Sequence, residues 1–269
     1  MKKKIILQLI FFAFVFNINI FSQSPKDKAY LLVKYDETSV KDSTDLLKKN
    51  YDVMGLEIGK TMSRFYSISL LETMKALEEQ IKQTGALDMR NLTTPKNKRG
   101  KQNIIFKNYT SKQLTATENL GMFSYTVQES IPVIDWKIQS DTMRILNYLC
   151  QKATCQFRGR NYEAWFTPEI NVSEGPWKFT GLPGLILKVT ENKGYFIFEC
   201  KGIEKVNLDL ELSDGKGQKV TREEFLKANK LFLEDPMPFM NNGRSSFTVE
   251  TLPANLPKRT YNPMELTEK

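Results

Sequence analysis

Histidine is missing from the 269 residues of the chain. Imidazole is the general base of Ser-His-Asp and Cys-His sites, and it is a frequent protein ligand of zinc. Its absence excludes those forms of catalysis and of metal binding. Carboxylate chemistry, a Ser-Lys pair and metal binding by oxygen ligands remain. The glycines lack the spacing of a phosphate-binding loop, and we expect neither a metal nor a cofactor.

Long apolar runs are also scarce. The longest, residues 5–16, follows three lysines at positions 2–4. A membrane-spanning helix needs about 20 apolar residues, whereas a basic start and a short apolar run are typical of a secretory signal peptide. We therefore expect residues 1–23 to be a signal peptide, cleaved near Ser22 or Gln23. The mature chain, 24–269, is then exported, periplasmic or secreted, with no transmembrane span.

Cysteine occurs three times, at Cys150, Cys155 and Cys200. An exported chain with three cysteines can form one disulfide and keep one thiol. On an extended strand, Cys150 and Cys155 lie about 16 Å apart, beyond the roughly 7 Å between Cα atoms that a disulfide allows. Cys200 is thus the expected partner of one of them. Strand alternation favours Cys155–Cys200, with Cys150–Cys200 as the alternative.

Acidic residues are slightly outnumbered, with 31 against 39 lysines and arginines. Loss of the signal peptide lowers the net charge from +8 to about +5, a surplus too small to indicate a nucleic-acid partner.

Two segments have helical patterns. Ser69 and Glu72 form a capping box ahead of a helix that Gly85 ends, and its apolar face is expected in the core. Thr221 and Glu224 form a second capping box, and the helix they open ends at Pro236. The apolar face of the first helix consists of Leu70, Met74, Leu77 and Ile81.

Two hairpins follow from alternating residues. Residues 157–162 predict a two-residue turn with Gly159 first, which pairs Phe157 with Tyr162. The alternation puts Phe157 and Cys155 on an apolar face and Trp165 on the opposite polar face. Residues 185–200 form the second hairpin. These elements predict an α+β fold: a curved antiparallel sheet, as in a half-barrel, with about two helices packed on its apolar face.

The connection ahead of the second hairpin carries the most distinctive residues. Leu182-Pro183-Gly184-Leu185 suits a type II turn, which needs φ > 0 at Gly184. The turn either only aims the next strand or holds Leu182, Trp177 and Phe179 along a binding edge.

Two further features have a structural and a functional interpretation. Arg158 and Arg160 flank Gly159, where they are either solvated or fork onto a carboxylate or phosphate. Trp165 either packs under a neighbouring segment or forms an exposed aromatic contact with Trp177. The candidate binding residues are Arg158, Gly159, Arg160, Trp165, Trp177, Phe179, Gly181, Leu182, Pro183 and Gly184.

Several segments, in their order along the chain, carry a family resemblance. They are Phe157-Arg158-Gly159-Arg160, Ala164-Trp165-Phe166-Thr167, Gly175-Pro176-Trp177-Lys178-Phe179, the hexapeptide 181–186 and the closing Asn262-Pro263-Met264-Glu265-Leu266. Together they closely resemble the GLPGLI family, exported proteins named for that hexapeptide. The resemblance implies one β-rich domain over 24–269 with a polar C-terminal tail, in the envelope of a Gram-negative bacterium. It implies no activity, cofactor or catalytic residue.

The sequence thus favours a non-catalytic envelope protein that binds a partner protein or an apolar ligand in the concavity of the sheet. The alternative is a hydrolase that uses carboxylates or a Ser-Lys pair, for which we identify no catalytic residue. Nucleic acid is not an expected partner.

Overall fold

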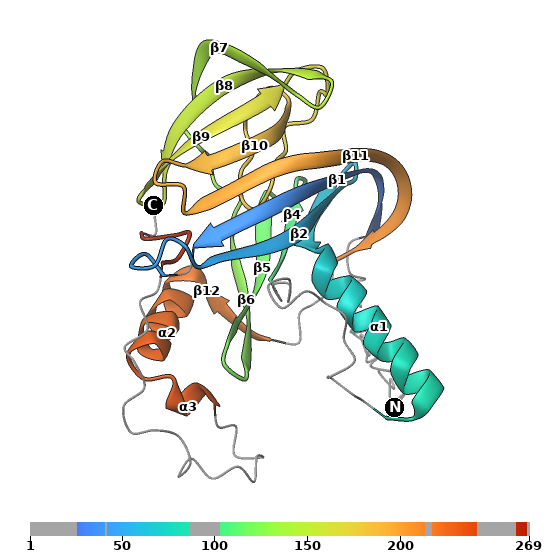
Figure 1. The fold of residues 1–269 in the computed structure, drawn as a ribbon, viewed down its shortest axis with the longest axis vertical. Helices are drawn as coiled ribbons and strands as arrows, with labels where there is room; N and C mark the ends of the chain where they lie inside the picture. The colour runs from blue at the N-terminus through green and yellow to red at the C-terminus, as the bar shows by residue number, and fades with distance from the viewer. Residues whose placement is uncertain (1–25, 41, 87–102, 213–216, 241–261, 268–269) are drawn as a thin grey trace, which may run out of the picture.

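Strands dominate the computed structural model, which describes residues 26–40, 42–86, 103–212, 217–240 and 262–267 (Figure 1). The predicted signal peptide, 1–23, lies outside the described residues. The described strands form one twelve-stranded sheet in the order β12-β6-β5-β4-β3-β2-β1-β11-β10-β9-β8-β7, antiparallel except where β12 pairs with β6. The strands are β1 Lys26–Val40, β2 Lys49–Ile58, β3 Met62–Ser67, β4 Ile104–Asn108, β5 Gln113–Leu120, β6 Phe123–Ser130, β7 Lys137–Ile145, β8 Tyr148–Phe157, β9 Arg160–Thr167, β10 Leu185–Glu191, β11 Phe196–Glu211 and β12 Gln218–Thr221.

The chain is mostly β, and not α+β as expected. Its described helices are α1 Ile68–Thr84, α2 Arg222–Glu234 and the single turn α3 Met237–Met240. None of them is long and apolar enough to cross a bilayer. Figure 1 shows α1 pointing away from the strands and α2 beside β12, so the helices do not cover the apolar face of the sheet.

Helix α1 begins and packs differently from the prediction. Its N-cap is Ser67, whose hydroxyl accepts a hydrogen bond from the backbone N–H of Leu70, and not Ser69. Gly85 ends the helix with φ 68°, as expected. The expected core packing is wrong, because Met74 and Ile81 are 48% and 46% exposed. By contrast, the capping box of Thr221 and Glu224 on α2 is confirmed.

Residues 168–184 connect β9 to β10 and pack on the inner side of the curved sheet. Phe179 is fully buried there, with ring centroids 4.8 Å from Tyr162, 5.2 Å from Trp177 and 6.1 Å from both Phe157 and Trp136. The same connection contacts β3, β4 and β6 in the other half of the sheet. It reaches both halves because the sheet curves around it, as predicted.

The hairpin of β8 and β9 has the predicted faces but a different turn. Arg158 and Gly159 are its two turn residues, with φ 51° and 78°, and Phe157 pairs with Arg160 instead of Tyr162. Type I′ turns need φ > 0 at both positions and match the twist of paired strands. Moving the turn back by one residue keeps Phe157 and Tyr162 on the buried face, and it adds Arg160 to that face.

Glycine is required at position 184 both by the close approach of another segment and by the backbone conformation. Its φ is 151°, not the value near 80° that a type II turn needs. A Cβ at this position would lie 2.1 Å from the carbonyl oxygen of Thr167. The backbone of the hexapeptide therefore passes directly over the end of β9.

The predicted disulfide is wrong. Cys150, Cys155 and Cys200 are all free and buried. Cys155 lies on β8 and Cys200 on β11, with β9 and β10 between them. Three strand spacings of about 4.8 Å separate these strands by roughly 14 Å along the sheet, about twice the reach of a disulfide.

Candidate functional site

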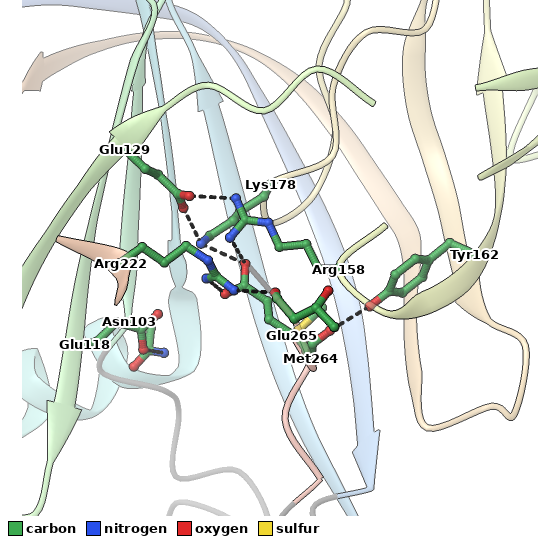
Figure 2. Close-up of polar contacts among 10 residues, drawn as sticks. Asn103, Glu118, Glu129, Arg158, Tyr162, Lys178, Arg222, Met264 and Glu265 are labelled. Carbon is green, nitrogen blue, oxygen red and sulfur yellow. Dashed lines mark hydrogen bonds and ion pairs between the residues drawn. The ribbon is translucent and has the colours of Figure 1, made fainter. Parts of the chain in front are cut away.

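Distant parts of the chain meet in one buried charge cluster, drawn in Figure 2. Arg158 Nη2 lies 2.6 Å from Glu129 Oε2, and Arg158 Nη1 lies 3.1 Å from Glu265 Oε1. Lys178 Nζ lies 2.5 Å from Glu129 Oε1 and 2.9 Å from Glu265 Oε1. Arg222, the first residue of α2, also pairs with Glu265. Three cations therefore surround two carboxylates, and all five side chains are largely buried.

The cluster shifts the titration of its members. Burial lowers the pKa of Lys178 to about 8, although Glu129 opposes the shift. Burial by itself would raise the pKa of Glu129, but Lys178 and Arg158 outweigh it, so that pKa lies below its ordinary value. Glu129 is held as a carboxylate by its two neighbours.

The second arginine of the turn contacts the C-terminal segment. Arg160 donates through Nε to the carbonyl of Pro263 at 3.0 Å, and through Nη2 to Asn262 Oδ1 at 2.5 Å. Its Nη1 also lies 3.5 Å from Glu191 Oε1. Both arginines therefore bond acceptors of the chain itself, and their predicted role in binding a ligand carboxylate or phosphate stays a prediction.

A second buried ion pair was missed at the sequence level. Lys107 Nζ on β4 lies 2.8 Å from Glu174 Oε2, and it also donates to the carbonyl of Phe179 at 3.2 Å. Ser63 donates to the same carboxylate oxygen at 3.4 Å. Burial raises the pKa of Glu174 although Lys107 opposes it. The lysine that follows the apolar run 104–106 could have indicated a buried charge. Its partner could not be identified, because it is far away in the chain.

Ser63 and Lys107 are the pair that would suit a Ser-Lys hydrolase. Both bind Glu174, and each is 1% exposed. A nucleophile needs contact with its substrate, and this pair has no exposed surface. In the described part of the chain, no group of three or more Cys, Asp or Glu residues is placed to hold a metal ion.

The residues predicted to form a binding edge have core contacts instead. Trp177, Phe179 and Leu182 are 8%, 0% and 1% exposed. Gly181 and Pro183 are exposed at the surface of the same connection. The binding role of these residues stays a prediction, and the structure shows that they pack the connection against the sheet.

Trp165 lies on the outward face of β9, apart from Trp177 in the core. Its Nε1 donates to Glu163 Oε1 at 2.8 Å, and Lys152 Nζ lies 5.8 Å from the ring centroid. Lys152 also pairs with Glu163 Oε2 at 2.7 Å. These bonds from Lys152 and Trp165 outweigh the effect of burial and lower the pKa of Glu163. Trp165 is thus half-buried and held in place.

Polar side chains surround Trp165 in register. Cross-strand pairing aligns Lys152, Trp165 and Lys188 in one row, and aligns Thr154, Glu163 and Thr190 in the next. A groove of about 980 Å³ lies along the second row, and neither Trp165 nor Lys152 is among its lining residues. Its lining residues are Asp135, Lys137, Thr154, Cys155, Gln156, Asn161, Tyr162, Glu163, Lys188, Thr190, Glu191 and Asn192. We call it the outer groove.

Comparisons with known proteins place the chain in a family. The model of the family described as N-glycanase peptide, N-terminal domain, matches residues 77–224, just over half of the chain. No curated protein matches. Two solved structures of PNGF-II, from different crystal forms, are 16% and 17% identical with TM-scores of 0.47 and 0.48. Each match covers 74% of this chain and 32% of the PNGF-II chain.

The family match corrects the resemblance to the GLPGLI family. The hexapeptide 181–186 lies within the matched region. Its glycine and apolar residues have local structural causes, namely the close approach of Gly184 to Thr167 and the burial of β10. Such a motif indicates a turn and a strand, and it does not by itself identify a family. By the match over residues 77–224, the chain belongs to the N-glycanase peptide, N-terminal domain family.

Proposed function

We propose that this chain is a non-catalytic binding module that holds a carbohydrate in the outer groove, beside Trp165. The observation that carries the proposal is a groove of about 980 Å³ lined mainly by amide, hydroxyl and charged side chains, one of which, Glu163, accepts a hydrogen bond from the indole of Trp165. Ligand sites of this kind combine a concave surface with a few well-placed polar groups.

The chemistry of the lining suits a ligand rich in hydroxyl groups. Sugar hydroxyls donate and accept hydrogen bonds, and so do the side chains of Asn161, Gln156 and Thr190. The charges nearly balance, which fits a neutral ligand. The bonds of Glu163 to Lys152 and Trp165 fix its carboxylate before a ligand arrives, which lowers the entropy cost of binding.

The family supports the choice of ligand class. The matching family is named for an N-glycanase, and a glycan is such a hydroxyl-rich ligand. The chain spans 32% of the solved PNGF-II chain.

An apolar ligand inside the sheet is not part of the proposal. The interior that would receive it is filled by Phe179, Trp177 and Leu182 of the chain itself. Export remains part of the proposal, based on the signal peptide expected at residues 1–23. Cell fractionation checks it: the mature chain is expected outside the cytoplasm, starting near Ser22 or Gln23.

Titration of the mature chain with a fluorescently labelled N-glycan core oligosaccharide tests the binding role. Loss of an anchoring aromatic commonly costs about 2 kcal/mol or more, which is over tenfold in affinity. Trp165→Ala is therefore expected to weaken binding by that factor. The matched control is Tyr51→Ala, which removes an exposed aromatic from β2, away from the groove. Equal affinities of the wild type and Trp165→Ala would contradict the proposal.

A further inference from the structure

The C-terminal segment 262–267, here called the tail, is bound to the rest of the chain as a peptide is bound in a recognition site. Six residues, which we call the seat, form hydrogen bonds or ion pairs with it: Val40, Arg158, Arg160, Tyr162, Lys178 and Arg222. These residues belong to β1, the β8–β9 hairpin, the connection 168–184 and α2. Figure 2 shows Glu265 of the tail pointing into the cationic part of the seat.

The seat recognises two side chains of the tail. Asn262 is bonded through both ends of its amide, since Nδ2 donates to the carbonyl of Val40 at 2.8 Å and Oδ1 accepts from Arg160. Glu265 accepts from three cations, Arg158, Lys178 and Arg222. Position 262 is restricted to Asn, because its side chain must both donate and accept. Position 265 is restricted to an acid, because its side chain meets three cations.

The backbone of the tail is bonded as well. Tyr162 donates to the carbonyl of Met264 at 3.1 Å, and the N–H of Leu266 donates to the carbonyl of Arg158 at 2.9 Å. A Cβ on Gly159 would lie 2.9 Å from Leu266 Cβ, so a larger residue in this turn would crowd the tail. The seat therefore fits an Asn-Pro-x-Glu-Leu segment in this bent conformation.

The seat is left unbalanced without the tail. Arg158 and Lys178 would then share the single carboxylate of Glu129, which leaves an excess of positive charge between these three side chains in a largely buried place. Uncompensated buried charge is costly. The seat therefore favours occupation by some carboxylate that carries the matching Asn and backbone groups.

Met264 of the tail packs against the hydrophobic core, whereas Leu266 is 55% exposed. Residues 241–261 separate it from α3, a stretch of chain that covers at most about 70 Å when extended. That covalent length lets one tail serve its own seat or the seat of another molecule. Every copy of the chain carries both halves of this pair.

We propose that the seat is a peptide-binding site that also accepts the tail of a second copy of this chain, so that copies associate by exchanging tails. Exchange replaces each contact within one chain by the identical contact between two chains. The equilibrium between the two arrangements is therefore set by linker geometry and by the concentration of the chain.

A labelled peptide of residues 260–269 tests the site, with the full mature chain as receptor. Glu265→Gln in the chain weakens its own tail and leaves the seat intact. This variant is expected to bind the peptide more tightly than the wild type does, because the wild-type tail competes. The same peptide with Glu265→Gln is expected to bind at least tenfold more weakly, and fluorescence anisotropy measures both. The proposal is overturned if the two peptides bind equally well or if neither binds. This test needs no substitution in the seat itself, which could destabilise the fold.

A mixing experiment tests the role of the second copy. Full-length wild-type and Glu265→Gln chains carry different affinity tags, and capture of one tag is followed by detection of the other. The Glu265→Gln chain is expected to retain wild-type chain, whereas a second Glu265→Gln chain, which lacks a competent tail, is retained several-fold less. High salt is expected to reduce retention, because ion pairs dominate the contact. Peptide binding without retention of the full chain would mean that the tail serves only its own seat, which contradicts the exchange.

Discussion

Lys107 and Glu174 form an ion pair of 2.8 Å although they are 67 residues apart in the chain, and their side chains are 1% and 3% exposed. Lys107 belongs to β4, and Glu174 to the connection that fills the curved sheet. The pair therefore links that connection to β4, in the half of the sheet that does not contain β9 and β10. Lys107 also donates to the carbonyl of Phe179 at 3.2 Å, a second bond to the same connection.

Removal of one partner of this pair is expected to be strongly destabilising. Lys107→Met leaves a buried carboxylate without its cation, which commonly costs about 3–5 kcal/mol. The double variant Lys107→Met/Glu174→Gln removes both charges and should lose less than Lys107→Met does. Urea denaturation at neutral pH measures the free energy of unfolding. A loss below about 1 kcal/mol in the single variant would show that the pair does not fasten the connection.

Gly184→Ala is expected to destabilise the fold by more than about 1 kcal/mol, since the new methyl group collides with backbone and the φ of 151° is unfavourable for alanine. Its carbon would lie 2.1 Å from the carbonyl oxygen of Thr167. Gly202→Ala is the matched control, because a Cβ there meets nothing within 4 Å. Thermal melts compare the two variants. Similar melting temperatures would contradict the close approach of Gly184 to β9.

Acid is expected to weaken the cluster at Glu129. The pKa of Glu129 in the folded chain lies below its ordinary value, so its contribution to stability is fully present above about pH 4.5. Below that pH the unfolded chain binds the proton first, and the contribution is lost as the pH falls through the lower, folded pKa. Melting curves of the wild type and Glu129→Gln between pH 3 and pH 7 isolate this group. The gap in melting temperature should shrink below about pH 4.5, and a constant gap would refute the assignment.

The cysteines are expected to stay reduced and slow to react in the native chain. Burial raises the pKa of Cys150 to about 11, and the pKa values of Cys155 and Cys200 to about 12. Little thiolate therefore exists at neutral pH. Titration with a thiol reagent should find three thiols in denaturant without reductant and far slower reaction in the native chain. Recovery of one thiol in denaturant would indicate the disulfide that the structure lacks.

Local features were predictable from neighbouring residues. The alternation around Phe157 placed it and Tyr162 on the buried face, because side-chain direction in a strand depends only on parity. Thr221 and Glu224 opened α2, since both partners of a capping box lie within one turn. The turn at Arg158 was misplaced by one residue, because its first position takes φ > 0 without being glycine.

The candidate site was predictable only in part. The sequence left open whether Arg158 and Arg160 are solvated or bind a carboxylate or phosphate, because Glu129 and Glu265 come from other regions of the chain. Likewise, the spacing of Met74 and Ile81 indicated an amphipathic helix, whereas only the tertiary structure decides whether an apolar face is covered.

The sequence alone determined the strand faces around Phe157, the capping box of α2 and the end of α1 at Gly85, because each depends on residues a few positions apart. The tertiary structure decided which strands are neighbours, and with that the separation of Cys155 from Cys200, the pairing of Lys107 with Glu174 and the docking of the tail on the seat. These contacts join residues from distant parts of the chain. They exist because a curved sheet closes around one connection, and no short pattern in the sequence encodes that closure.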